Sequence, residues 1–211
     1  MEVQESTKEE VTMLVEFLYD FASPHSYVAF HKLRELSSRL ALEVNYSPIF
    51  LGGIFKATND APLLAGSLEY DYMTKSLQRL SKTLGIPFNF QHSSFPVNSL
   101  RPLRGTYFAS SEGKLVEYIS AVFGAYWVSG VDISDQNALG KIAGSLGLDR
   151  ESFLLSIEDE AAKLRLKDDT QRALQRGVFG APTYFVDGEM YWGSPEVLWY
   201  LEKRLTGVSG K

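Results

Sequence analysis

The sequence predicts an α/β fold in which a long helical segment separates the two sheet-forming parts of the chain. A strand–helix–strand pattern spans residues 13–50, and strand patterns return only at residues 183–192. Because strand–helix–strand units pair their strands in parallel, the first part alone indicates an α/β sheet. The 211 residues, 45% hydrophobic and 13% aromatic, are enough for a packed core in one domain with a sizeable insertion.

Three consecutive signals make up the opening pattern. Residues 13–19 form an apolar run broken only by Glu16, which is typical of a largely buried strand. Pro24 favours the first turn of a helix, and apolar side chains then recur at mostly three- and four-residue spacing up to Leu40. Residues 42–50 alternate between apolar and polar side chains and predict the second strand.

The middle of the chain loses this strand character. Residues 51–56, Leu-Gly-Gly-Ile-Phe-Lys, are expected to form a glycine-containing loop after the second strand. The helices expected beyond this loop cover residues 67–84, 100–109, 115–127, 135–146 and 150–176.

The last part of the chain returns to strands. Residues 183–186 are rich in β-forming side chains, Asp187-Gly188 is typical of a hairpin turn, and residues 189–192 predict the returning strand. A final helix is expected after Gly193-Ser194-Pro195. We therefore expect a disordered tail (1–10), a discontinuous α/β domain (11–58 and 177–207) and a helical insertion domain (59–176).

The composition excludes several kinds of chemistry. The chain contains no cysteine, so disulfides, thiolate metal sites and a cysteine nucleophile are excluded together, and three histidines alone make a poor zinc site. The net charge of −5 argues against nucleic acid as a partner. No apolar stretch is long enough to cross a membrane, and the acidic, polar first ten residues are unlike a secretory signal, so we expect a cytoplasmic protein.

The segment Ser23-Pro24-His25-Ser26 is the strongest functional signal. It has the spacing of a Cys-x-x-Cys redox pair between a strand and a helix, but hydroxyls replace both sulfurs. A hydroxyl at a helix N-terminus can donate a hydrogen bond to a thiolate held there, so Ser23 is the candidate that binds another molecule's sulfur. The alternative is that Ser23 only caps the helix. We expect Ser26 to be structural, and His25 to face solvent or shape the rim of a pocket.

A second group of candidates comes from segments far away in the chain. A cis Ala181–Pro182 bond would leave the N–H and C=O of Ala181 free to pair with an extended peptide, whereas a trans bond would make only a strand-entry turn. Ser194 could cap the last helix and receive a carboxylate. Lys56 and Asn59 could also meet a ligand carboxylate, with a solvated loop as the alternative.

Taken together, these motifs resemble one family. Residues 20–27, Asp-Phe-Ala-Ser-Pro-His-Ser-Tyr, are similar to the D-x-x-S-P-x-S-[YW] segment of the 2-hydroxychromene-2-carboxylate isomerases and kappa-class glutathione transferases. Residues 177–183 and 187–193 resemble the isomerase signature G-V-F-G-V-P-T…D-G-E…W-G, and residues 51–56 resemble the kappa-class loop. The resemblance implies a thioredoxin-like fold with a helical insertion domain, as in the DsbA-like superfamily.

The resemblance also implies roles for individual residues. Ser23 would hold the sulfur of glutathione as a thiolate, and Ala181, before a cis Pro182, would pair with its cysteinyl part. Ser194 would receive the γ-glutamyl carboxylate, and Lys56 and Asn59 would lie near the glycine end. The residues expected around the second substrate, between the thioredoxin core and the insertion, are Phe21, His25, Asn98 and Trp127. The chain departs from the family where Pro195 occupies the usual acidic position and where Asp60 takes the position of the expected asparagine.

These implications leave three functions to compare. The first is a glutathione-dependent isomerase, in which a thiolate held by Ser23 adds reversibly to an unsaturated, aromatic-derived substrate. The second is a kappa-class-like transferase that conjugates glutathione to electrophiles, and the third is a redox-inactive thioredoxin-fold module that binds peptides. A dithiol oxidoreductase is excluded by the absent cysteines unless the two serines replace natural ones. Trp199 and Tyr200 near the C-terminus leave room for a homodimer.

Overall fold

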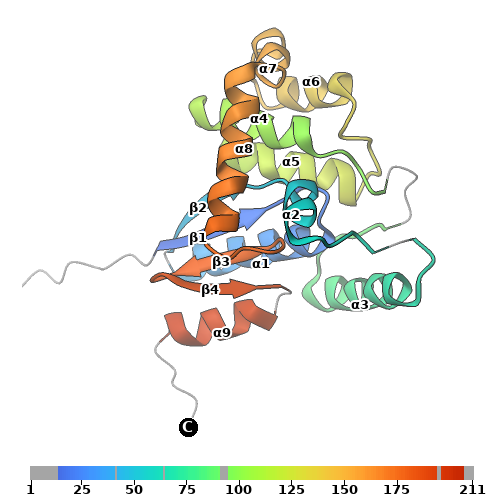
Figure 1. The fold of residues 1–211 in the computed structure, drawn as a ribbon, viewed down its shortest axis with the longest axis vertical. Coiled ribbons are helices and arrows are strands. Elements are labelled where there is room, and N and C mark those ends of the chain that lie inside the picture. Colours follow the sequence, from blue (N-terminus) through green and yellow to red (C-terminus); the bar gives the residue numbers. More distant parts are fainter. Residues whose placement is uncertain (1–13, 41, 64, 91–94, 194–195, 207–211) are drawn as a thin grey trace, which may run out of the picture.

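The computed structural model describes residues 14–40, 42–63, 65–90, 95–193 and 196–206 (Figure 1). Its four-stranded sheet has the order β2-β1-β3-β4. Strand β1 (Leu14–Tyr19) pairs in parallel with β2 (Glu43–Pro48), and antiparallel with β3 (Thr183–Val186). Strand β4 (Glu189–Trp192) completes a hairpin with β3. The predicted parallel pair and the predicted hairpin are both confirmed.

Helices follow the order that the sequence predicts, with two additions. Helix α1 (Pro24–Leu40) joins β1 to β2. The helices between β2 and β3 are α2 (Leu51–Thr58), α3 (Leu68–Leu84), α4 (Leu100–Ser111), α5 (Leu115–Trp127), α6 (Gln136–Ser145), α7 (Arg150–Ser156) and α8 (Glu160–Gln175). Helix α9 (Glu196–Leu205) follows β4 and lies beside it, away from α4–α7 (Figure 1).

The expected loop at residues 51–56 is wrong, because these residues form most of α2. The Leu51 N–H at the start of α2 donates to the Asp20 carboxylate (2.8 Å). Gly53 packs against α8, where a Cβ would lie 3.4 Å from the Thr170 side chain. Tertiary contacts therefore make a helix of a segment whose glycines argue locally against one.

The expected single helix over residues 150–176 is also wrong. It is two helices, because the carboxylate of Asp159 accepts hydrogen bonds from the N–H groups of Ala161 and Ala162 and so starts α8 anew. Aspartate is among the most favourable N-cap residues, so Asp159 itself indicates a helix start at this position. We did not recognise it because the segment is rich in charged residues throughout.

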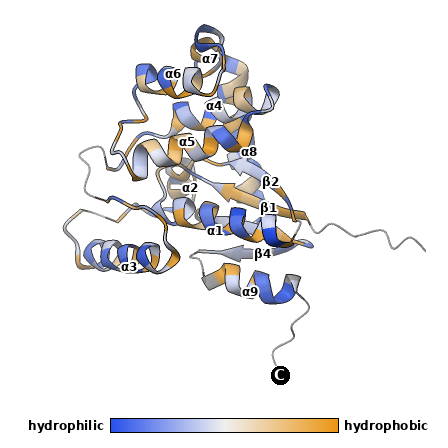
Figure 2. Cartoon of the chain, turned by 180° about the vertical axis from the view of Figure 1, so that it is seen from behind, coloured by the Kyte–Doolittle hydropathy of each residue, from blue (hydrophilic) through white to orange (hydrophobic). Residues whose placement is uncertain are grey.

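Alternation along β1 separates the two faces of the sheet. Val15, Phe17 and Tyr19 are buried in the main core, which also takes in α1, α5 and α9, whereas Leu18 faces the end of α8 in a smaller cluster with Ala173. Figure 2 shows β1 as largely hydrophobic, with hydrophilic residues on the outer face of α1 and over much of α3.

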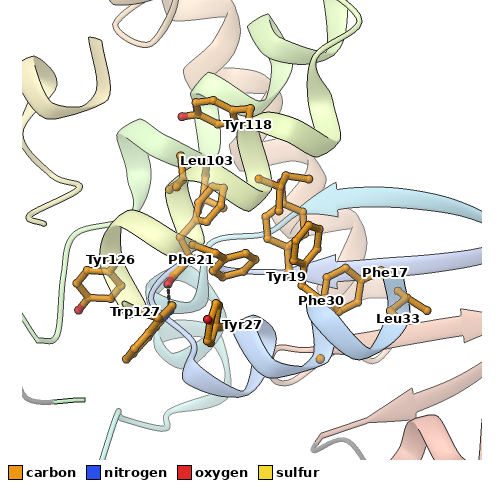
Figure 3. Close-up of a cluster of buried hydrophobic side chains, with 14 of the residues drawn as sticks. Phe17, Tyr19, Phe21, Tyr27, Phe30, Leu33, Leu103, Tyr118, Tyr126 and Trp127 are labelled. Carbon is orange, nitrogen blue, oxygen red and sulfur yellow. Dashed lines mark hydrogen bonds between the residues drawn. The ribbon is translucent and has the colours of Figure 1, made fainter. Parts of the chain in front are cut away.

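An aromatic cluster joins the sheet to the helical segment. Figure 3 shows Tyr19, Phe21 and Phe30 in this cluster. The centroid of the Phe21 ring lies 4.9 Å from that of the Phe123 ring of α5, and Phe123 also packs on Tyr19 and Phe30. Because this core is continuous, the carboxyl end of β1 has a fixed position against the helices around it.

Candidate active site at the start of helix α1

Ser23 lies buried between the end of β1 and the start of α1, with 4% of its surface exposed. Its Oγ accepts a hydrogen bond from the Ser26 N–H (3.1 Å), the geometry of a helix N-cap. The same Oγ donates its proton to the Ala181 carbonyl (2.9 Å). Ser23 is therefore a cap and also a contact to a loop that lies 158 residues further along the chain.

The loop that contains Ala181 has a cis Ala181–Pro182 peptide bond. Two neighbouring contacts fix it: the Thr183 hydroxyl donates to the Gly180 carbonyl (2.8 Å), and the Gly193 N–H donates to the Pro182 carbonyl (3.1 Å). Ala181 itself is half-buried, and among the described residues its N–H has no acceptor. Ala181 therefore presents a backbone N–H without an acceptor beside a carbonyl that accepts the Ser23 proton.

Asp20 connects this junction to the helical segment, a role that we did not assign to it from the sequence. Its buried carboxylate accepts from the N–H groups of Ala22 (2.9 Å) and Leu51 (2.8 Å), and hydrogen bonds with the Ser99 side chain at the start of α4. Burial raises the pKa of Asp20, and the hydrogen bond with Ser99 lowers it in part. One side chain thus sets the positions of the Ser23 loop, α2 and α4.

The four residues expected around the second substrate occupy different environments. Phe21 and Trp127 have no exposed surface, and the Trp127 indole N–H donates to the Phe21 carbonyl (3.0 Å; Figure 3). Both therefore belong to the core beneath the junction instead of lining an open surface. His25 is half-buried, and the exposed Asn98 uses its Oδ1 to accept from the Leu100 N–H (3.1 Å) at the start of α4.

The residues expected around glutathione are only partly brought together. Ser23, Ala181 and Pro182 meet, whereas Lys56 lines a separate cavity of about 410 Å³ between α2, α4 and α8. Asn59 ends α2 in the left-handed conformation (φ 56°) and is exposed. Ser194 lies outside the described residues.

The fold and this junction together define the class of protein. Residues 14–202 match the family model of the DSBA-like thioredoxin domain, and the chain belongs to this family. Within it, the chain is 33% identical over 184 residues to the 2-hydroxychromene-2-carboxylate isomerase of Pseudomonas putida, covering 86% of this chain and 89% of the relative. The predicted resemblance and the predicted thioredoxin-like fold with a helical insertion are confirmed.

Two further comparisons agree with this placement. A solved structure of a 2-hydroxychromene-2-carboxylate isomerase superimposes with a TM-score of 0.83 at 30% identity, over 94% of this chain and all of that one. The glutathione S-transferase kappa 1 of Rattus norvegicus is 27% identical over 191 residues, 84% of each chain. These relatives are named as enzymes, as the sequence predicted for this chain.

Among the helices of the described residues, none combines the length and the apolar character that a membrane span requires. The described part of the chain also contains no group of three acidic, histidine or cysteine side chains placed to hold a metal ion.

Proposed function

We propose that the chain is a glutathione-dependent isomerase that acts on a small, unsaturated, aromatic-derived substrate. The observation that carries the proposal is the meeting of the Ser23 hydroxyl with the Ala181 backbone at 2.9 Å. When bound, glutathione would supply a thiolate that adds to the substrate and is released again.

Ser23 would stabilise the sulfur as a thiolate. A serine hydroxyl has one proton to donate, and in this structure the proton is directed at the Ala181 carbonyl. A peptide N–H that binds this carbonyl would replace Ser23 as the donor and leave the hydroxyl for a sulfur. The positive end of the α1 dipole lies at the same place and favours the anion.

Ala181 and Pro182 would hold the cysteinyl part of the ligand. The Ala181 N–H has no acceptor among the described residues and can donate to a ligand carbonyl, while the Ala181 carbonyl accepts from a ligand N–H. We assign Asn59 and Ser194 to the outer parts of the tripeptide and leave Lys56 out, because it lines the separate cavity. His25 and Asn98 are the candidates for contact with the second substrate.

The proposal is tested by measuring glutathione binding calorimetrically and following the ionisation of the bound thiol through its ultraviolet absorbance. We compare the wild type, Ser23→Ala, and Ser67→Ala as a control that removes a helix cap on α3. A hydrogen bond to a charged group contributes about 1.5–3 kcal/mol, so Ser23→Ala should raise the pKa of the bound thiol by about 1–2 units. Ser67→Ala should leave it unchanged.

Two results would contradict the proposal. One is the absence of binding at millimolar glutathione, and the other is an unchanged thiol pKa in Ser23→Ala, which would leave Ser23 as a helix cap only. Turnover with an electrophilic enone then separates the two enzyme classes. An isomerase leaves the free thiol concentration constant, whereas a transferase consumes one thiol for each product.

A further inference from the structure

The cavity between α2, α4 and α8 has an unusual lining for a chain with a net charge of −5. Its volume is about 410 Å³, within the range of pockets that hold small molecules. The charged side chains that line it are all basic: Lys56 from α2, Arg104 from α4, and Lys163 and Lys167 from α8. Its apolar lining includes Phe50, Leu100, Leu166 and Leu174.

Helix spacing explains how one face of α8 supplies much of this lining. Lys163, Leu166, Lys167, Thr170 and Leu174 recur at intervals of three and four residues, which places them along one side of the helix. Thr170 fixes this side against α2, because its hydroxyl accepts from the Phe50 N–H (3.0 Å) and donates to the Leu166 carbonyl (2.8 Å). The basic and apolar groups are therefore held on a rigid wall.

The positive charges in this cavity are only partly neutralised by the protein. Lys163 pairs with Glu160 (2.7 Å), and Glu158 lies 3.6 Å from Arg104 while it also binds Arg101 (2.5 Å). Lys56 and Lys167 have no ion-pair partner among the described residues.

Arg104 gives a second, independent indication that the cavity suits an anion. Its side chain is 12% exposed, and one guanidinium N–H donates to the Ile157 carbonyl (3.1 Å). Its Nε–H, however, is buried and has no acceptor within the described part of the chain. A buried donor on a charged group that lacks an acceptor is costly, and an anion bound beside the Arg104 guanidinium would offset part of that cost through its charge.

From this lining we propose that the cavity between α2, α4 and α8 binds a small carboxylate with an apolar body, at a site separate from Ser23. The apolar body would contact Phe50, Leu166 and Leu174, and the carboxylate would lie among Arg104, Lys56 and Lys167. None of Ser23, Ala181 and Pro182 lines this cavity, so binding there requires neither glutathione nor the Ser23 hydroxyl.

The test measures binding of 1-naphthoate, with 1-naphthylmethanol as the uncharged probe of nearly the same shape. The wild type should bind the naphthoate more tightly than the alcohol, and added salt should weaken only the naphthoate. The variant Lys56→Gln/Lys167→Gln removes two exposed lysines and should weaken naphthoate binding about tenfold while leaving the alcohol within about twofold. Circular dichroism verifies that the variant is folded.

The matched control is Lys75→Gln/Lys141→Gln, which changes the net charge equally at two exposed lysines outside the cavity. It should keep the wild-type affinity for naphthoate, as should Ser23→Ala and wild type saturated with glutathione. The proposal is overturned if naphthoate fails to bind at millimolar concentration or binds no better than the alcohol. It is also overturned if both lysine variants lose affinity equally, or if glutathione displaces the naphthoate.

Discussion

Removing the Ser23 hydroxyl should destabilise the protein by more than the loss of an ordinary helix cap. The structure gives this oxygen two hydrogen bonds: it accepts from the Ser26 N–H at 3.1 Å and donates to the Ala181 carbonyl at 2.9 Å. Ser23→Ala removes both at a buried position, where water cannot replace them without rearrangement.

The expected size of the effect follows from these two bonds. Loss of a serine N-cap costs about 1 kcal/mol, and loss of the donor to the Ala181 carbonyl costs about 1 kcal/mol more. For a chain of this size, a total of about 2 kcal/mol corresponds to a fall of about 4–8 °C in the melting temperature. The first bond acts on α1 alone, whereas the second connects α1 to the loop before β3.

The assay is urea unfolding followed by circular dichroism, with Ser67→Ala as the comparison. Ser67 caps α3 by accepting from the Tyr70 N–H (3.1 Å). We expect Ser67→Ala to cost about 1 kcal/mol and Ser23→Ala to cost about twice as much. If Ser23→Ala costs no more than Ser67→Ala, the hydrogen bond between Ser23 and Ala181 contributes nothing to stability, which would contradict this prediction.

Two further predictions concern packing and pH. Gly105→Ala in α4 should lower the free energy of unfolding in urea by about 1–3 kcal/mol, because the new Cβ would lie 2.3 Å from the buried Tyr118 hydroxyl. Gly124→Ala in α5 adds a Cβ that meets nothing within 4 Å and should raise the free energy of unfolding by up to about 1 kcal/mol. Equal effects of the two substitutions would contradict this prediction. Burial raises the pKa of Asp20 in the folded state, so the folded protein holds the Asp20 proton more tightly than the unfolded chain does. This proton binding stabilises the fold fully below the unfolded pKa of about 4, and the stabilisation is lost as the pH rises through the folded pKa. The unfolding free energy of wild type minus that of Asp20→Asn, measured by urea titration at several pH values, should therefore fall as the pH rises, and a flat or rising difference would refute the assignment.

The sequence by itself predicts those features that depend on near neighbours. The run at residues 13–19, the Asp187-Gly188 turn and the cap at Ser23 are local, because strand alternation, turn conformation and capping involve residues only a few positions apart. The absence of cysteine is likewise a property of composition, and it excludes dithiol chemistry with no structural information. The motif around Ser23, taken together with residues 177–183 and 187–193, also indicates the family.

The tertiary structure alone decided which distant groups meet. Whether the Ser23 proton reaches the Ala181 carbonyl depends on the pairing of β1 with β3, and whether residues 51–58 form a helix depends on Asp20 and α8. The basic cavity is formed by helices α2, α4 and α8. No local sequence pattern indicates that these three helices face one another. Local propensity acts over a few residues, whereas these contacts are fixed only when the core packs, and for that reason they could not be predicted from the sequence.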